Sequence, residues 1–251
     1  MCGRYAVTSS PEAIRALFRY QELPNFPPRF NIAPSQPIPI VRLQDGQRQF
    51  ALVRWGLLPS WVKDPKTFTL LINARGETAA DKPAFRAAMR RRRCLVPADG
   101  FYEWKAVGGR KQPFFVRAKA GGPIAFAGLW ETWTGPNGEE VETAAIVTTR
   151  ANRMLAPIHD RMPVIVPPDA FDLWLDTTAV DPHTAATLIQ PAPEDVLQAY
   201  EVSTAVNRVA NDNPQLLEPA AALAAEPEPK PAATPRPQRR IKNDDGQGAL
   251  F

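Results

Sequence analysis

The sequence contains only two cysteines and two histidines among its 251 residues. Two cysteines cannot form the disulfide framework that stabilises small secreted domains. No basic segment followed by a short apolar run opens the chain, and no stretch of about 18 apolar residues is available for a transmembrane helix. We therefore expect a cytoplasmic protein without a membrane partner.

The common motifs of nucleotide and zinc chemistry are absent as well. The sequence has no P-loop, no dinucleotide-binding fingerprint, no C-x-x-C pair and no H-E-x-x-H helix. It therefore gives no reason to expect a metal or an organic cofactor. The formal net charge of +4 and the isoelectric point near 9.2 favour a polyanionic partner, although charge alone does not identify one.

The hydrophobic fraction of 44% is enough for one sizeable core. The S-P-E triplet at residues 10–12 is a typical helix start, and the apolar spacing after it predicts a helix to about Tyr20. From residue 94 to residue 149, short β-prone runs alternate with glycine turns. Strands interrupted irregularly by helices predict an α+β fold with a largely antiparallel β core and peripheral helices.

Two stretches of the chain are rich in proline and together hold twelve of its 28 prolines. Six of them lie between residues 24 and 39, which predicts that residues 29–34 form a stiff surface loop. Beyond Glu218 the composition changes to Ala, Pro and Glu, which cannot bury enough apolar surface to fold. We therefore predict one domain over residues 1–217 and a disordered tail over residues 218–251.

A run of four arginines, Arg90–Arg93, ends a predicted helix that begins near Pro83. Cations are favoured at a helix C-terminus by the helix dipole, so we interpret this run as a solvated helix end rather than as a DNA-binding patch. Cys94 follows within an apolar run and is predicted to be a buried small side chain. A β-hairpin is predicted around the Asp45-Gly46 turn.

The first five residues, MCGRY, offer an unusual nucleophile. Met1 precedes a small side chain and is normally removed in this context, which leaves Cys2 with a free α-amine beside its thiol. Such an aminothiol condenses with an aldehyde to an imine, and the thiol then closes a five-membered thiazolidine ring. Both groups have ordinary pKa values of about 8, so either can act as a nucleophile near neutral pH. The alternative is that Cys2 is merely an early residue.

Two further side chains invite a chemical interpretation. Glu103 interrupts an aromatic strand. If Glu103 faces solvent, it is an ordinary surface carboxylate of an antiparallel sheet. If it is buried among the aromatic rings, its pKa rises and it can serve as a general acid or base. His159 lies in a proline-bracketed polar loop, where a functional and a structural role explain it equally well. His183 follows a predicted helix start and is expected at the surface.

Six short motifs follow one another along the predicted domain. They are Met1-Cys2-Gly3-Arg4-Tyr5, Asn31-Ile32-Ala33-Pro34, Trp55-Gly56-Leu57, Ile72-Asn73-Ala74-Arg75-Gly76-Glu77-Thr78, Gly100-Phe101-Tyr102-Glu103-Trp104 and Ile158-His159-Asp160-Arg161-Met162-Pro163. In this order they resemble the SRAP family, the SOS response-associated peptidases or abasic-site processing proteins. The resemblance covers about residues 2–210 and implies a single SRAP-type domain.

The resemblance also implies covalent chemistry on DNA. In the family, the N-terminal cysteine forms a thiazolidine with the ring-opened sugar of an abasic site in single-stranded DNA, and this crosslink shields the site during the DNA damage response. Matched by motif, Cys2 is the nucleophile, Asn73 positions it, and Glu103 is the acid/base. His159 engages the sugar hydroxyl. The implied DNA contacts are Arg4, Arg75 and Arg161 with phosphates, and Pro34, Trp61 and Trp104 as stacking or wedging groups.

Other activities stay open at this point. The family's older name indicates a thiol peptidase that acts on itself or on other chains, which would need a Cys2 thiolate paired with His159 and an oxyanion hole. A non-catalytic single-strand binder would work without the Cys2 thiol. An AP-lyase side activity, which nicks the strand, is expected if the imine eliminates before the ring closes.

The last five residues, Gln247-Gly248-Ala249-Leu250-Phe251, fit the Q-x-x-L-F pattern by which bacterial proteins dock on the replication sliding clamp. A random tail end is the alternative. A flexible tether would raise the local concentration of the domain at stalled forks. We therefore expect a monomeric, nucleoid-associated protein whose partners are abasic single-stranded DNA and, through residues 247–251, the clamp.

Overall fold

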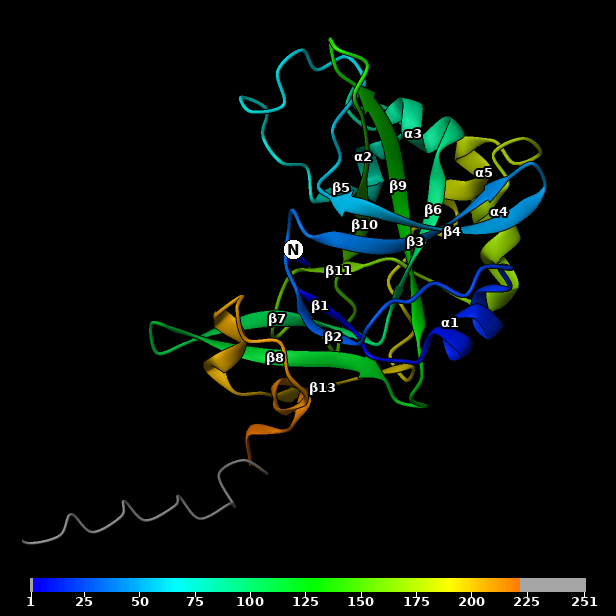
Figure 1. Ribbon diagram of the computed structural model, residues 1–251. Coiled ribbons are helices and arrows are strands. Elements are labelled where there is room, and N and C mark those ends of the chain that lie inside the picture. Colours follow the sequence, from blue (N-terminus) through cyan, green and yellow to red (C-terminus); the bar gives the residue numbers. More distant parts are fainter. Residues whose placement is uncertain (1, 222–251) are drawn as a thin grey trace, which may run out of the picture.

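A computed structural model describes residues 2–221, and within them the strands form two sheets (Figure 1). The smaller sheet has the strand order β13-β8-β7-β1-β2, with every neighbouring pair antiparallel. Its strands are β1 (Tyr5–Val7), β2 (Arg29–Ile32), β7 (Gly100–Val107), β8 (Arg110–Ala118) and β13 (Leu197–Glu201).

The larger sheet closes on itself. Its pairings run β10-β4-β3-β6-β9 and return from β9 to β10, so these five strands enclose part of the core. Among the described strands, β4 and β5 are the two that run parallel to β10. The strands are β3 (Pro37–Gln44), β4 (Gln47–Trp55), β5 (Asn73–Arg75), β6 (Arg93–Ala98), β9 (Ile124–Thr134), β10 (Glu140–Arg150), β11 (Arg161–Pro163) and β12 (Ile165–Val166).

Short helices lie around the sheets (Figure 1). They are α1 (Pro11–Phe18), α2 (Gly76–Ala79), α3 (Arg86–Arg91), α4 (Phe171–Leu175) and α5 (Pro182–Ala186), with 3-10 turns η1 (Pro168–Ala170), η2 (Thr204–Asn207) and η3 (Pro214–Leu217). The predicted α+β fold with a largely antiparallel core is confirmed. No helix within residues 2–221 is long and apolar enough to cross a membrane.

Aromatic side chains hold the short strand β1 against the larger sheet. The Tyr5 ring packs edge-on against Trp55, with 5.3 Å between the ring centroids, and also against Phe126. All three side chains are buried. Burial of a large apolar side chain contributes on the order of 2–3 kcal/mol, so these contacts fix the strand that follows Cys2.

The loop predicted for residues 29–34 is wrong. Residues 29–32 form the edge strand β2, which pairs with β1, and Asn31, Ile32 and Ala33 are buried. None of the prolines of this region falls within residues 29–32. Because β2 is an edge strand, one side of it has no neighbouring strand to pair with. Prolines next to such a strand therefore disrupt no hydrogen bonds of the sheet.

Two prolines lie inside β3 without breaking its pairing. The carbonyl oxygen of Gln36 accepts a hydrogen bond from the Trp55 amide in β4. The ring nitrogen of Pro37 belongs to the same peptide unit, so it points away from β4, and alternation gives Pro39 the same direction. On that side β6 pairs with β3 only further along the strand. The missing amide hydrogens therefore leave no gap in a ladder.

The arginine run is only partly a solvated helix end. Arg90 and Arg91 are exposed at the end of α3, as predicted. Arg93 is 1% exposed in β6, and its guanidinium donates to four backbone carbonyls, so the interpretation is wrong for this residue. Cys94 is buried and the Asp45-Gly46 turn joins β3 to β4, which confirms both predictions.

Residues 222–251 lie outside the described part of the chain. They include most of the predicted tail and the clamp-binding pattern at residues 247–251. The domain limits and the tail therefore stay predictions.

Candidate active site

Cys2 lies just before β1 and is fully buried. The antiparallel pairing of β1 with β7 sets Tyr5 opposite Phe101. Continuing this register by two residues toward the N-terminus places residue 3 opposite Glu103. The smaller sheet thus brings the start of the chain to Glu103.

The larger sheet contributes Asn73, the first residue of β5, which pairs with Ile146 of β10. The Asn73 Nδ2 atom donates a hydrogen bond of 2.9 Å to the carbonyl oxygen of Cys2. The Asn73 Oδ1 atom is buried and accepts no hydrogen bond from the described residues. A free α-amine on Cys2 would be a donor of the kind that this oxygen lacks.

Glu103 is 2% exposed. Its strand neighbours Phe101 and Tyr102 are both fully buried, so both faces of β7 are covered and the solvent-facing alternative is excluded. Burial raises the pKa of the Glu103 carboxyl, and the nearby His159 opposes this with a smaller lowering effect. The side chain can therefore hold and release a proton closer to neutral pH than an exposed glutamate.

His159 precedes β11, and both nitrogens of its imidazole lie near polar groups. The backbone N–H of Arg161 donates to Nδ1 at 3.0 Å. Where Nδ1 accepts this bond, the hydrogen of the neutral ring is on Nε2, and Nε2 lies 3.9 Å from Oε2 of Glu103. The Asp160 carboxylate lies 3.0 Å from Nδ1, so a protonated ring would have a carboxylate on each side.

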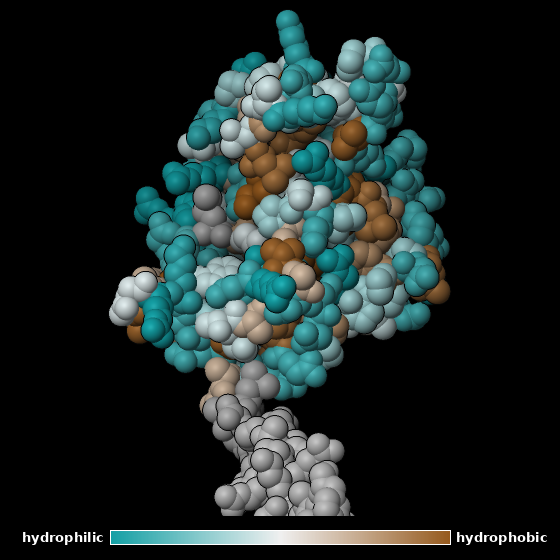
Figure 2. All heavy atoms as spheres, turned by 60° about the vertical axis from the view of Figure 1, so that its left-hand side comes forward, coloured by the Kyte–Doolittle hydropathy of each residue, from teal (hydrophilic) through white to brown (hydrophobic). Residues whose placement is uncertain are grey.

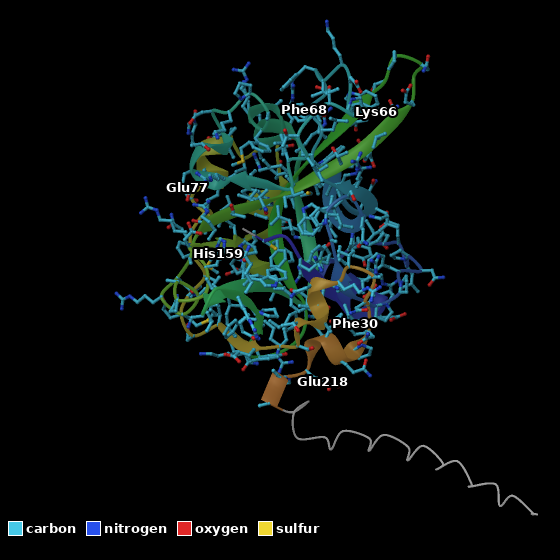
Figure 3. All side chains as sticks on the ribbon, turned by 90° about the vertical axis from the view of Figure 1, so that its left-hand side faces the viewer. Phe30, Lys66, Phe68, Glu77, His159 and Glu218 are labelled. Carbon is cyan, nitrogen blue, oxygen red and sulfur yellow. The ribbon has the colours of Figure 1, made fainter. Side chains whose placement is uncertain are left out.

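A hollow of about 460 Å³ opens beside Glu103 and His159. In Figure 3, His159 lies below Glu77. The hollow is within the size range of small-ligand sites. Its remaining lining residues are Ile72, Trp104, Lys111 and Asn207.

Sequence reasoning missed Lys111 and Asn207 as lining residues of this hollow. Lys111 lies in the hairpin between β7 and β8, opposite Ala106, in a stretch without any motif. Asn207 ends η2, far along the chain from the other residues of the hollow. The sequence carries no signal for either, because only the folded sheet brings them together.

The Cys2 thiol is held in its neutral form. Burial raises its pKa strongly, and the negative charge of Glu103 raises it further. Cys94 also has a raised thiol pKa, from burial. The Cys2 sulfur is therefore suited to a reaction in which it attacks after another group has activated the carbon, rather than as a preformed thiolate.

The predicted DNA contacts differ in their exposure. Trp61 is 58% exposed and packs edge-on against Phe68, while Arg75 is exposed beside Asn73. Pro34 and Trp104 are half-buried. The face drawn in Figure 2 is largely hydrophilic and carries several separate hydrophobic patches.

Arg4 and Arg161 are already engaged within the protein. Arg161 makes two hydrogen bonds to the Glu77 carboxylate, at 2.6 and 2.9 Å, and these lower the pKa of Glu77. Arg4 donates to Oδ1 of Asn31 at 2.7 Å and to the carbonyl oxygen of Val206 at 2.8 Å. Both bonds of Arg4 use Nη1, so a phosphate can approach its Nη2. Arg161 uses both terminal nitrogens and would have to exchange a partner to bind a phosphate.

Comparison with known proteins gives one consistent picture. The family model described as SOS response associated peptidase (SRAP) matches residues 1–209. The chain is 40% identical to the abasic site processing protein YoqW of Bacillus subtilis, over 87% of this chain and 99% of that protein. It is 33% identical to YedK of Escherichia coli, over 87% and 100%, and 30% identical to HMCES of Xenopus tropicalis, over 86% and 78%. Both are also named abasic site processing proteins.

Solved structures show the same fold. A protein from Bacteroides thetaiotaomicron superposes with a TM-score of 0.79 at 25% identity, covering 87% of this chain and all of that chain. A phage-related protein from Bordetella bronchiseptica gives a TM-score of 0.65 at 33% identity, covering 80% of this chain and 94% of that chain.

Proposed function

Because the chain belongs to the SOS response-associated peptidase (SRAP) family, we propose that it processes abasic sites in single-stranded DNA by covalent capture through Cys2. Three relatives named abasic site processing proteins support this target. The observation that carries the proposal is a convergence of two sheets. Asn73 binds the Cys2 backbone, the charge of Glu103 acts on the Cys2 thiol, and Glu103 shares a hollow with His159.

The first step is attack of the Cys2 α-amine on the aldehyde of the ring-opened sugar. The amine must be neutral, so Glu103 takes a proton from the α-ammonium. Attack gives a carbinolamine, and Glu103 returns the proton to its hydroxyl, which leaves as water. The nitrogen then gives its remaining proton to the Glu103 carboxylate, which leaves a neutral imine. The raised pKa of Glu103 suits these transfers near neutral pH.

The second step closes the ring. The neutral Cys2 thiol adds across the imine, so that sulfur bonds to carbon and the thiol proton ends on nitrogen. The product is a thiazolidine that joins the chain to the DNA. Holding amine, thiol and aldehyde together makes the reaction intramolecular, for which effective molarities on the order of 10⁵ M are reached with well-oriented groups.

The surrounding residues position the DNA in this proposal. The Nε2–H of His159 donates to the sugar hydroxyl released on ring opening, and Asn73 orients the Cys2 amine. Arg75 contacts a phosphate and Trp61 stacks on a base, because both are exposed. An abasic nucleotide has no base to unstack, so its entry into the hollow costs little. Pro34 and Trp104 are proposed to wedge against neighbouring bases. Arg4 is proposed to contact a phosphate through Nη2, and Arg161 to contact one after exchanging a partner.

A thiol peptidase is less well supported. Such an enzyme needs a thiolate, whereas burial and the Glu103 charge both raise the pKa of Cys2. The imidazole of His159 is directed by its contacts toward Glu103. The residues that the peptidase would use are therefore better arranged for proton transfer than for thiolate formation.

The proposal is tested by mixing the purified protein with single-stranded DNA whose uracil has been excised, followed by denaturing electrophoresis. Wild type is expected to give a heat-stable crosslink without borohydride, and intact DNA to give none. In Cys2→Ser the imine forms without ring closure, so β-elimination should nick the strand. A heat-stable, borohydride-independent crosslink from Cys2→Ser would contradict the mechanism.

Two further variants separate the alternatives. A variant that retains Met1 lacks the aminothiol and should form no crosslink, with the state of the N-terminus checked by intact mass. A non-catalytic single-strand binder would give the same outcome for wild type and Cys2→Ala. Modification of peptides but not of abasic DNA would favour the peptidase.

The clamp contact is proposed on sequence alone, because residues 247–251 lie outside the described residues. Deletion of these residues is expected to abolish binding to the sliding clamp in a pull-down while leaving crosslinking unchanged. If the deletion variant still bound the clamp, or if the intact chain did not bind it, the proposed clamp contact would be wrong.

A further inference from the structure

One wall of the hollow carries polar groups that the proposed chemistry does not use. The Trp104 indole N–H donates to Oδ1 of Asn207 at 2.7 Å. Because an indole nitrogen is only a donor, the amide oxygen must face it, and the amide NH₂ is left available at the hollow. Lys111 lines the same hollow and is exposed. Among residues 2–221, no acidic side chain lies within ion-pair distance of Lys111.

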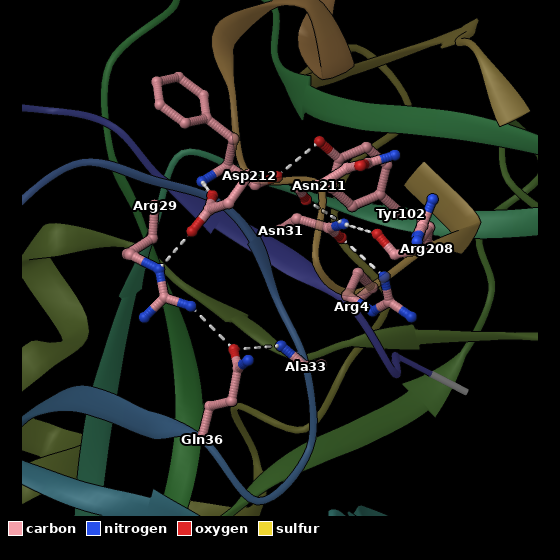
Figure 4. Close-up of polar contacts among 10 residues, drawn as sticks. Arg4, Arg29, Asn31, Ala33, Gln36, Tyr102, Arg208, Asn211 and Asp212 are labelled. Atoms are coloured by element: carbon pink, nitrogen blue, oxygen red, sulfur yellow. Dashed lines mark hydrogen bonds and ion pairs between the residues drawn. The ribbon is translucent and has the colours of Figure 1, made fainter. Parts of the chain in front are cut away.

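The segment that bears Asn207, residues 203–212, is fastened to β2. The Nδ2 atom of Asn31 donates to the carbonyl oxygens of Arg208 and Asn211 (Figure 4) and to that of Val206. At the end of the segment, Asp212 accepts from the Arg29 side chain and from the Phe30 amide. The buried Asn31 of the N-I-A-P motif thus holds the C-terminal segment in register with the start of the chain.

Arg4 completes this attachment from β1. Its guanidinium donates to Val206, next to Asn207, and lies 5.9 Å from the centroid of the Trp104 ring. The Asn207 amide is therefore fixed from both sides, by the backbone on one and by the indole on the other. A donor held in this way loses little entropy when a ligand binds.

We propose that Lys111 and Asn207 form an anion subsite that holds a phosphate flanking the abasic sugar. This inference rests on the proposed function, because the sugar must lie against Glu103 and His159 in the same hollow. A lysine ammonium and an amide NH₂ are both donors without acceptor capacity on the exposed atoms, which suits a phosphodiester oxygen. A volume of about 460 Å³ accommodates a sugar together with one phosphate.

Equilibrium binding tests the subsite without any crosslinking. The probe is single-stranded DNA with one tetrahydrofuran abasic analogue, which has no aldehyde, and Kd is measured by fluorescence anisotropy. Lys111→Gln is expected to raise Kd roughly tenfold, as loss of one charge-assisted hydrogen bond does. The matched control is Arg110→Gln, which removes the same charge from the neighbouring position of the same hairpin and should change Kd less than about twofold.

Neutralising the phosphate identifies the contact. The same DNA is made with a methylphosphonate linkage on the 5′ or on the 3′ side of the abasic analogue. When the linkage on the contacted side is neutralised, the Kd of wild type should rise by roughly the same tenfold factor. Lys111→Gln should then raise Kd no further on that DNA, as a double-mutant cycle requires. The subsite would be overturned if Lys111→Gln and Arg110→Gln raised Kd equally. It would also be overturned if Lys111→Gln still raised Kd tenfold on both modified DNAs.

Asn207→Asp gives a second, independent readout. The aspartate keeps an oxygen for the Trp104 N–H but replaces the NH₂ donor with a negative oxygen, so Kd should rise at least as much as in Lys111→Gln. An unchanged Kd in this variant would show that the Asn207 amide does not contact the phosphate. If wild type binds as expected but forms no crosslink with uracil-excised DNA, the proposed function fails while the subsite stands.

Discussion

Nε2 of His159 lies 3.9 Å from Oε2 of Glu103, although His159 precedes a strand of the larger sheet and Glu103 lies in the smaller one. Two opposing effects meet at this carboxyl, since burial raises its pKa and His159 lowers it, and burial dominates. Nε2 of His159 therefore faces a carboxyl that keeps its proton to a higher pH than an exposed glutamate does. The Arg161 amide donates to Nδ1, the other nitrogen of the ring. Both groups face one hollow.

Glu103→Gln is predicted to slow crosslinking by about 10²- to 10⁴-fold, the usual contribution of a general acid–base group. Glutamine keeps the size of the side chain but cannot take the proton from the α-ammonium. The measurement is the single-turnover rate on uracil-excised single-stranded DNA with protein in excess.

Glu131→Gln is the matched control for that rate. Glu131 is also a buried carboxyl with a pKa raised by burial, but it pairs with Arg92 away from the hollow. We expect its rate to stay within about twofold of wild type. Equal slowing in both variants, or an unchanged rate in Glu103→Gln, would show that Glu103 transfers no proton.

Glu103→Gln is also predicted to change the pH dependence of stability. The pKa of Glu103 is higher in the folded than in the unfolded chain, so between the two values the folded state binds more protons. Its contribution to the free energy of unfolding therefore falls as pH rises from 4.5 toward the folded value. The glutamine variant has no such charge to bury and should be more stable than wild type at pH 7. Urea unfolding between pH 4 and pH 8 checks this. The difference in free energy of unfolding between the variant and wild type should shrink toward pH 4, and a variant less stable than wild type at pH 7 would contradict the prediction.

Much of the fold could be predicted because local patterns decide it. Ser10 caps α1 through a hydrogen bond to the Ala13 amide, and the Asp45-Gly46 turn closes the hairpin of β3 and β4. Residues 29–32 were predicted wrongly because nearby prolines mark loops on average, while pairing with β1 at a sheet edge overrides that tendency. Arg93 was misjudged for a similar reason, since its carbonyl partners come from a distant segment.

The site was predictable only where a motif marked it. Glu103 could be identified as unusual among aromatic residues, but its burial depends on both faces of β7 being covered. Lys111 and Asn207 meet in the hollow only through tertiary pairing. The engagement of Arg161 by Glu77 likewise joins two motifs that look independent in the sequence.

Asn73→Asp is predicted to slow crosslinking about tenfold, because an aspartate cannot donate to the Cys2 carbonyl and the nucleophile loses its fixed orientation. The rate at saturating DNA separates orientation from binding. Asn73→Gln, which restores the amide on a longer side chain, should recover part of the rate. Wild-type rates in Asn73→Asp would remove its positioning role.

Arg93→Met is predicted to reduce the free energy of unfolding by about 3–5 kcal/mol, because the buried guanidinium is replaced and several carbonyls lose their donor. The guanidinium donates to Met89, Trp174, Asp176 and Val180 at 2.6 to 2.9 Å, which ties β6 to the chain around α4. Thermal unfolding should show a midpoint lower by roughly 10 °C.

The exposed Arg90 provides the control for this prediction. Arg90→Met removes the same charge from the same run and should shift the midpoint by less than about 2 °C, since surface substitutions stay within about 0.5 kcal/mol. Arg93→Lys keeps the charge but offers its donors from a single atom. Its unfolding midpoint should therefore lie between those of Arg93→Met and Arg90→Met. If Arg93→Met unfolds at the same temperature as Arg90→Met, the four carbonyl contacts contribute nothing to stability, and the distinction between the buried and the solvated arginines of this run has no energetic meaning.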